Sequence, residues 1–205
     1  MNSIDHPSTL PCVVKVLANP YPHTIPDSEF SLLVVTVAQR LRDQIYADHN
    51  GLEAGQFGAL KRPSLGLCVM NPTLPRYMKA EDAVMALIAI GPEGEDFLVN
   101  GVGKAVEHWE LGQDCGISAY VQVHRLPDGS FIYGHSAEVD GTIVGASAAT
   151  ELQDRSMAGR LAHELNSCVG DARKRWREAH PDHKWFCNQN EPDQRFTKIA
   201  GLLHR

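Results

Sequence analysis

Two short β-favouring runs separated by an Asp-Gly dipeptide constrain the fold of this chain more than any other feature. The runs lie at 130–135 and 142–147, and both contain residues that favour strands. Asp140-Gly141 tolerates the positive φ angles of a tight hairpin turn. Strands joined by such a turn pair antiparallel, so this segment predicts a hairpin within an antiparallel sheet.

Small residues fill the junction between the second run and the next predicted helix. Thr150 with Gln153 three positions later predicts a capping box, so the helix is expected to begin there. Small side chains leave room for a ligand, and the N-terminus of a helix offers backbone N–H groups to an anion. The same small residues would also let this helix cross the sheet closely, and both interpretations can hold together. The predicted ligand-binding residues at the junction are Gly145, Ala146, Ser147, Ala148 and Thr150.

The remaining helix and strand signals place this hairpin in an α+β fold. Apolar residues recur at helical spacing over 27–50 and 97–112, and β-favouring runs occur at 65–70, 84–90 and 119–125. The resulting order is helix, two strands, helix, three strands and helix. This order predicts a five-stranded antiparallel sheet flanked by helices.

Three regions are expected along the chain. Residues 1–26 contain five prolines and predict an extended arm with a short strand at 12–17. Residues 27–170 form the predicted α+β domain. Residues 171–205 are rich in charged and aromatic side chains, and this C-terminal extension is expected to pack on the domain or on a neighbouring subunit.

Charge and cysteine content narrow the class of protein. A formal net charge of −6 argues against a protein that mainly binds nucleic acid. No apolar run approaches the roughly 20 residues needed to span a bilayer, and the N-terminus lacks the pattern of a secretory signal. The five cysteines are odd in number and include no CxxC pair, which favours a reducing compartment. We therefore expect a cytoplasmic protein with no nucleic-acid or membrane partner.

A series of short motifs runs through residues 100–162. In chain order they are Lys104-Ala105 on a helix, Gly134 at a strand end, Asp140-Gly141, Gly145-Ala146-Ser147, and Gln153-Asp154 at a helix start. This succession resembles the HbpS/GlcG-like haem-binding, or haem-degrading, family, and the resemblance extends more weakly over 27–166.

The resemblance implies a profilin-like three-layer fold, symmetric homo-oligomers, and haem or a related tetrapyrrole as ligand. Two positions depart from the family pattern. His135 stands where the family has the second of two glycines, and Ala148 stands where a glycine follows the serine. Both departures fall on the expected rim of the pocket.

His135 and Lys104 are the candidate catalytic residues. His135 could ligate a haem iron or another metal, or act as a general acid or base; the alternative is a rim histidine tied to backbone carbonyls. Lys104 could meet an anionic ligand group, although helical lysines usually lie on the solvated face. The pocket is expected between a turn at 134–138, the loop 145–150 and the 97–112 helix. The remaining predicted ligand contacts are Gly134, His135 and Ser136.

Two other residue sets suggest different chemistry. Ser147 between a strand and a helix is similar to a hydrolase nucleophile elbow, with Asp171 and His180 in the chain order of a triad. That elbow requires Gly-x-Ser-x-Gly on a parallel sheet, whereas an antiparallel hairpin precedes this serine. His180 and His183 followed by Cys187 have ligand types at zinc-compatible spacing, but no second cysteine pair accompanies them.

We therefore expect a protein that binds haem or another small, partly anionic organic ligand. The alternative is an enzyme on the same scaffold that performs acid–base chemistry, of isomerase, lyase or cyclase type, on a small carbonyl or carboxylate substrate. His135 would then carry the proton, and Lys104 or the N–H groups of 145–150 would stabilise an oxyanion. A subunit-interaction module without a ligand is the third class, since a fold does not decide function.

Overall fold

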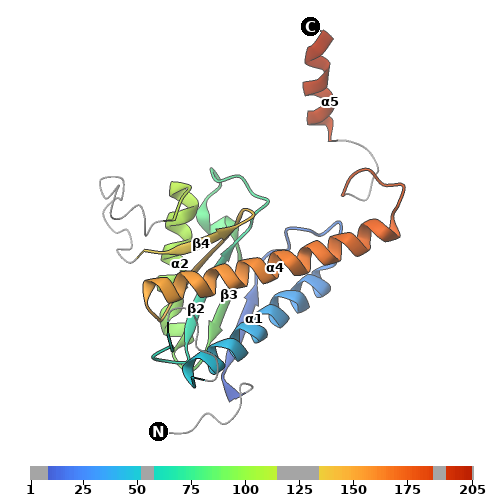
Figure 1. Cartoon of the computed structure of the whole chain (residues 1–205). Helices are drawn as coiled ribbons and strands as arrows, with labels where there is room; N and C mark the ends of the chain where they lie inside the picture. The colour runs from blue at the N-terminus through green and yellow to red at the C-terminus, as the bar shows by residue number, and fades with distance from the viewer. Residues whose placement is uncertain (1–8, 52–57, 115–133, 187–192, 205) are drawn as a thin grey trace.

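The computed structural model describes residues 9–51, 58–114, 134–186 and 193–204, and these fold around one antiparallel sheet. The strand order is β1-β3-β2-β5-β4, so β1 and β4 form the two edges (Figure 1). Every neighbouring pair is antiparallel, which confirms the predicted α+β class with a five-stranded antiparallel sheet. The strands are β1 Cys12–Val16, β2 Leu65–Met70, β3 Val84–Ile90, β4 Ser136–Val139 and β5 Thr142–Ser147.

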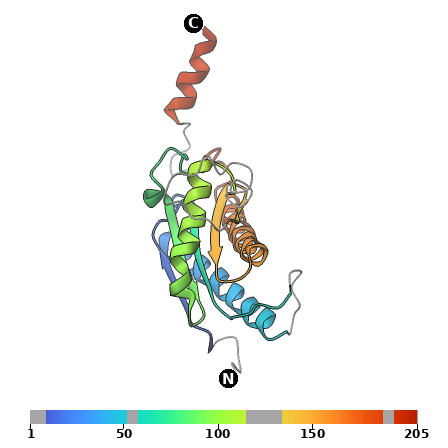
Figure 2. The same cartoon turned by 90° about the vertical axis from the view of Figure 1, so that its left-hand side faces the viewer.

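Helices cover both faces of this sheet and make three layers (Figure 2). Helix α2, Gly94–Leu111, lies on one face and packs mainly against β2 and β5. Helices α1, Asp27–His49, and α4, Glu151–Ala179, lie side by side on the other face. Because it lies between these layers, β2 is buried along its whole length. The remaining elements are η2 Ala80–Ala83, α5 Gln194–Ala200 and η4 Gly201–His204.

The apolar stripe predicted at 27–50 holds α1 on the sheet. Its five inward positions are each at most 4% exposed, and they share one core cluster with apolar residues of β2, β3 and α4. Burying each of these side chains contributes roughly 1.5–3 kcal/mol relative to exposure. The five residues are Phe30, Val34, Val37, Leu41 and Ile45.

Three glycines allow α2 to lie directly on the sheet. A Cβ at Gly145 of β5 would overlap the carbonyl oxygen of Gly101 on α2. A Cβ at Gly101 would stand 2.6 Å from the carbonyl oxygen of Gly66 on β2, and one at Gly66 would stand 2.5 Å from the Leu98 nitrogen. Close packing of a helix on the sheet therefore explains the glycine at position 145. The helix that packs there is α2, however, and not α4, the helix after β5 for which the sequence predicted this contact.

The hairpin turn lies where the sequence predicts it, but its first strand is displaced. Asp140 (φ 48°) and Gly141 (φ 83°) form a two-residue turn, and the residues on either side of them are paired. The described first strand, β4, begins at Ser136, so the predicted turn at 134–138 is wrong. Pairing with β5 starts directly at a two-residue turn, and this tertiary contact overrides the weak strand preference of Ser-Ala-Glu-Val.

The N-terminal arm contributes the strand at the other edge of the sheet. The predicted strand at 12–17 is β1, which pairs antiparallel with β3. The sheet therefore includes part of the predicted 1–26 arm. The predicted strand at 119–125 and the first four residues of the predicted strand at 130–135 lie outside the described residues, and positions 134 and 135 are not in a strand.

Helix α4 begins with the predicted capping box and continues beyond the predicted end of the domain. Thr150 accepts a hydrogen bond from the Gln153 N–H, and the Gln153 side chain accepts one from the Thr150 N–H. The helix passes Gly170 and ends at Ala179, so the first part of the predicted 171–205 extension is continuous with it. No residue of α5 is buried. None of the described helices is both long and apolar enough to cross a membrane.

Candidate functional site

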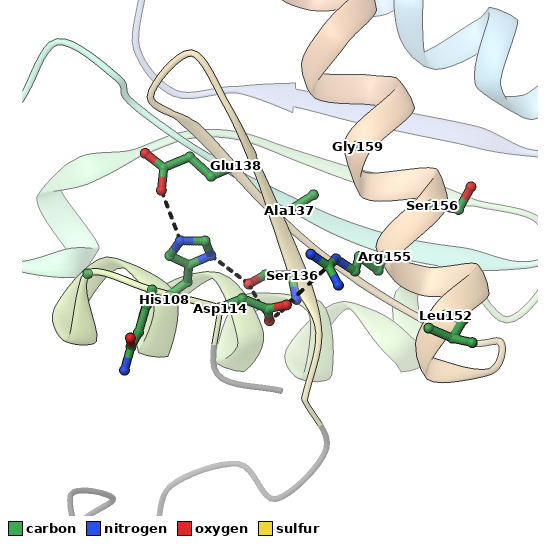
Figure 3. Close-up of a pocket in the computed structure, with 11 residues that line it drawn as sticks. His108, Asp114, Ser136, Ala137, Glu138, Leu152, Arg155, Ser156 and Gly159 are labelled. Carbon is green, nitrogen blue, oxygen red and sulfur yellow. Dashed lines mark hydrogen bonds and ion pairs between the residues drawn. The ribbon is translucent and has the colours of Figure 1, made fainter. Parts of the chain in front are cut away.

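A hollow of about 670 Å³ lies beside edge strand β4, between the C-terminal end of α2 and the first turns of α4 (Figure 3). We call it the β4 pocket, and its volume is in the range of sites that bind small organic molecules. Its lining residues are His108, Gly112, Gln113, Asp114, Ser136, Ala137, Glu138, Leu152, Arg155, Ser156 and Gly159.

A chain of hydrogen bonds joins the polar side chains along one wall of the β4 pocket. His108 Nδ1 lies 2.7 Å from Ser136 Oγ, and His108 Nε2 lies 3.1 Å from a Glu138 carboxylate oxygen. Arg76 donates a hydrogen bond of 2.6 Å to the other Glu138 oxygen. Burial lowers the pKa of His108, against the opposing effect of Glu138, so the ring is neutral near pH 7. A neutral ring that donates to Glu138 accepts a hydrogen bond from the Ser136 hydroxyl.

Asp114, just after α2, connects this network to His135 and to α4. One carboxylate oxygen accepts the backbone N–H of Ser136 at 3.0 Å and lies 3.4 Å from Ser136 Oγ. The other lies 3.2 Å from His135 Nδ1 and 3.7 Å from Arg155 Nε. The Asp114 side chain is 11% exposed and that of Arg155 is 47% exposed, so the pair reaches from the interior to the open pocket (Figure 3).

His135 adopts a backbone conformation that suits glycine. Its φ of 73° lies in the left-handed region, and this is the position where the resemblance places a glycine. Its Nε2 lies 3.8 Å from the Glu151 carboxylate, while Nδ1 faces Asp114. Within the part of the chain that the structure describes, the ring is therefore oriented by carboxylates, whereas the rim alternative expected backbone carbonyls. A carboxylate on Nδ1 fixes the tautomer and leaves Nε2 to exchange a proton or bind a ligand.

Ser136, His108 and Glu138 have the residue types of a nucleophilic triad, but their burial does not suit that role. Ser136 is 0% exposed and His108 is 3% exposed. The Ser136 hydroxyl is enclosed between His108 and Asp114, whereas a nucleophilic oxygen must reach a substrate carbonyl. These side chains therefore support the wall of the β4 pocket.

A second hollow, of about 200 Å³, lies where β5 ends and α4 begins. Lys104 of α2 reaches Asp154 of α4 there, with Nζ 2.7 Å from Oδ2. The two side chains are 2% and 3% exposed, so the alternative of a solvated helical lysine is wrong. We call this hollow the Lys104 pocket. Its lining residues are Arg62, Phe97, Asn100, Lys104, Ser147, Ala148, Ala149, Glu151 and Asp154.

Asp154 supplies the carboxylate that the N–H groups of the β5–α4 junction bind. The Ala149 N–H donates to Asp154 Oδ1 at 2.9 Å, and the Ala148 N–H also bonds to this carboxylate. Burial raises the pKa of Asp154, while Lys104 and these N–H groups oppose the rise. The anion site predicted at the start of this helix is therefore occupied by the chain's own side chain.

The other residues predicted at the junction have separate surroundings. Ser147 and Ala148 line the Lys104 pocket, and Ala148 has a φ of 154°, which residues with a side chain rarely adopt. The Thr150 hydroxyl takes part in the capping box. Gly145 and Ala146 are buried within β5 and line neither hollow. Of the five, Ser147 and Ala148 thus remain in a position to contact a ligand.

The single pocket predicted from the sequence corresponds to two hollows. His135 and Ser136 meet at Asp114, whereas Lys104 faces the second hollow. His135 contacts one lining residue of each hollow, Asp114 and Glu151. Gly134 is buried and lines neither.

Sequence reasoning missed Asp114, Glu138 and Arg155 as site residues and treated Asp154 only as part of a motif. Ser136 and Glu138 alternate along β4, and this period of two could have indicated one shared face. For the others, no local signal exists, because each meets partners from distant parts of the chain.

The alternative catalytic set is not assembled, and the zinc set is described only in part. Ser147 precedes α4, whereas Asp171 lies about 20 residues along that helix, roughly 30 Å away at 1.5 Å per residue. Of the zinc set, the His180 and His183 rings lie 5.3 Å apart, His180 also stacks on Trp176 at 4.4 Å, and Cys187 lies outside the described residues. The described parts of the chain contain no cluster of three or more metal-binding side chains.

The described residues of these hollows give little support for haem. His108, the histidine that lines the β4 pocket, has both ring nitrogens hydrogen-bonded and offers neither to an iron, so His135 Nε2 is the ring nitrogen left for ligation there. Seven of the eleven lining residues of the β4 pocket are polar or charged. The Lys104 pocket, at about 200 Å³, is too small for a tetrapyrrole.

Comparison of the chain with protein-family models, with curated proteins and with solved structures finds no match. The function is therefore argued from the chemistry of the two hollows.

Proposed function

We propose that this protein binds a small, partly anionic organic ligand in the β4 pocket. The observation that carries the proposal is the hollow of about 670 Å³ itself. The Arg155 guanidinium lies on one side of it, and the hydrogen-bonded side chains of His108, Glu138 and Asp114 lie on another. A concave site of this size with a few convergent polar groups is typical of small-molecule binding.

Arg155 is the proposed contact for the anionic group. Its Nε faces Asp114 at 3.7 Å and the side chain is 47% exposed, so its terminal nitrogens can meet a carboxylate that enters from solvent. Arginine and carboxylate can form two parallel hydrogen bonds, which adds geometric specificity. Leu152, on the same helix and 50% exposed, offers an apolar contact. A small organic acid with an apolar portion therefore fits this site best.

Titration calorimetry with benzoate and phenylacetate as probes tests the proposal, and hemin is the competing ligand. We expect saturable binding of at least one acid at one site per chain, accompanied by a higher Tm. Arg155→Gln should weaken binding by roughly 10- to 100-fold, as expected for a hydrogen bond between charged groups. Arg160→Gln, on an exposed position of the same helix, is the matched control and should change nothing.

Two results would overturn this assignment. Equal weakening by Arg155→Gln and Arg160→Gln would show that general charge, and not the pocket, attracts the acid. A saturable Soret shift with hemin that His135→Ala abolishes, together with no binding of either acid, would establish the haem alternative implied by the resemblance.

Acid–base catalysis on a small carbonyl or carboxylate substrate is a second candidate, favoured by the His135–Asp114 pair. The carboxylate 3.2 Å from Nδ1 suits His135 to the role of proton carrier through Nε2. Exchange of α-protons of pyruvate with deuterated solvent, followed by NMR, is the measurement. His135→Asn should abolish the exchange and Lys104→Met should retain it. Equal exchange by wild type and His135→Asn would reject this function.

We further propose that copies of this chain form a homo-oligomer in the cytoplasm. Phe196, Ile199 and Leu202 recur three positions apart in the C-terminal segment and are 49–64% exposed, which supports a contact with another copy. The described cysteines Cys12, Cys68 and Cys168 are unpaired, which supports a reducing compartment. Light scattering of the purified protein tests the assembly, and a monomeric mass at every concentration would reject it.

A further inference from the structure

We propose that the C-terminal segment of one copy of this chain docks in a groove between α1 and α4 of a second copy. The segment consists of residues 193–204, which include α5 and η4. The inference rests on the homo-oligomer proposed above, and it names the two surfaces that meet. Neither the β4 pocket nor the Lys104 pocket takes part in this contact.

The groove is a hollow of about 250 Å³ lined by residues of α1 and α4, and we call it the α1–α4 groove. Its wall is largely apolar. Leu33, Thr36 and Cys168 line it and are half-buried, whereas Leu32, which also lines it, is 66% exposed. An exposed leucine beside half-buried apolar side chains is typical of a surface that binds another protein segment.

The C-terminal segment carries a stripe of apolar side chains that its own chain does not bury. Phe196, Ile199 and Leu202 are 49%, 64% and 58% exposed. Phe196 contacts the Trp185 ring, with centroids 5.8 Å apart, so Ile199 and Leu202 are the more exposed members of the stripe. No residue of α5 is buried, and Figure 1 shows α5 apart from the sheet and its covering helices. A short helix with one apolar edge is suited to lie in an apolar groove.

The net charge of the segment is opposite to that of the rest of the chain. Residues 193–205 contain one acidic and three basic residues, so their formal charge is +2. The whole chain carries −6, which leaves −8 on residues 1–192. Opposite charges on two surfaces favour their encounter and select against wrong partners. The segment therefore fits an acidic surface of another copy of this chain.

The α1–α4 groove offers a carboxylate for this basic segment. Two acidic residues line the groove, and one of them, Glu29, is already paired with Arg175 at 3.0 Å. The other, Asp171, is exposed and has no ion pair among the described residues. Lys198, next to Ile199 on α5, is likewise exposed and unpaired within the part of the chain that the structure describes. We expect Lys198 to meet Asp171 when Ile199 enters the groove, which orients the segment more than it adds affinity.

A second copy is the partner because the segment does not cover the groove of its own chain. None of the described residues of 193–204 lines the α1–α4 groove. Each copy has one segment and one groove, so a reciprocal exchange uses both and closes a two-fold dimer. Each contact involves only a few side chains, whereas stable complexes bury roughly 1,200–2,000 Å². The dimer is therefore expected to dissociate on dilution.

Sedimentation equilibrium of the full-length chain tests the proposal. We expect the mass to rise from 22.6 kDa toward twice that value as the concentration increases. Ile199→Glu and Leu32→Glu should each raise the dimer dissociation constant at least about 100-fold, since each removes an apolar contact worth about 10-fold from both halves of the dimer. Gln194→Glu on α5 and Gln39→Glu on α1 are the matched controls, because they add the same charge at exposed positions outside the two surfaces. These controls should change the constant by less than about 3-fold.

An equimolar mixture of Ile199→Glu and Leu32→Glu shows whether the two surfaces bind each other. The first variant keeps an intact groove and the second keeps an intact segment, so mixing restores one of the two contacts. We expect the mixture to associate more strongly than either variant alone.

Two results would overturn the docking site while the homo-oligomer proposal stands. One is a wild-type dimer that survives Leu32→Glu or Ile199→Glu with an unchanged dissociation constant. The other is a mixture that associates no more than the separate variants, which would show that the segment and the groove belong to different contacts. A wild-type mass of one chain at every concentration would reject the docking site and the homo-oligomer together.

Discussion

One added methyl group at Gly145 should destabilise the protein strongly, because α2 occupies the space that it needs. The new Cβ would overlap the Gly101 carbonyl oxygen and lie 2.6 Å from the Ala105 nitrogen and 3.0 Å from the Ala105 Cβ. The two closest atoms belong to the backbone and cannot rotate away, so α2 must move off the sheet. Overpacking of this kind costs about 3 kcal/mol. For a chain of this length, that corresponds to a decrease in Tm of roughly 6–12 °C.

Gly170→Ala is the matched control, because it adds the same methyl group where nothing lies within 4 Å. Gly170 is exposed inside α4, where alanine favours the helix, so this change should stabilise by roughly 0.5–1 kcal/mol. Urea denaturation followed by circular dichroism measures both variants, with a constant m-value as the check on two-state unfolding. A Gly145→Ala variant within about 0.5 kcal/mol of wild type would refute the close contact of α2 with the sheet.

Three further outcomes follow from the backbone, burial and pKa of particular residues. Ala148→Gly should raise the free energy of unfolding by about 1 kcal/mol, since it relieves a φ of 154°; a loss of stability in urea would contradict the strain. Burial lowers the pKa of His108, so the unfolded chain binds more protons and stability should fall as the pH decreases through about 6.5. His108→Asn should reduce the dependence of the urea midpoint on pH, and an unchanged dependence would show that other titratable groups cause it. Removing residues 193–205 should abolish the proposed self-association and leave unchanged the Tm measured at a protein concentration where the chain is monomeric, because no residue of α5 is buried; a decrease in that Tm would reveal packing of this segment on its own chain.

Much of the fold could be predicted because its signals are local. The stripe of α1, the apolar runs of β2 and β3, and the capping box of α4 are each contained within one segment. The displaced first strand of the hairpin shows the limit. Ser136–Val139 has weak strand preference, and its state depends on pairing with β5, which no propensity measures.

The site was harder to predict because its contacts join distant segments. Lys104 lies on a helix where lysines usually face solvent, and its burial depends on Asp154, fifty residues later in the chain. Asp114 likewise acquires its role from Ser136 and Arg155. Residue types at the β5–α4 junction did indicate an anion site, but the sequence cannot tell that a nearby side chain fills it.

The close packing of α2 on the sheet, which depends on glycines, also determines how the two hollows can change over evolution. Lys104 and His108 are four residues apart on α2, and each faces a different hollow. A substitution at Gly101, which lines neither, would shift the helix and so alter both hollows together. On α4, by contrast, the adjacent residues Asp154 and Arg155 face different hollows, so either can be replaced without touching the other. A change confined to one hollow can therefore occur through α4, whereas a shift of α2 changes both hollows at once.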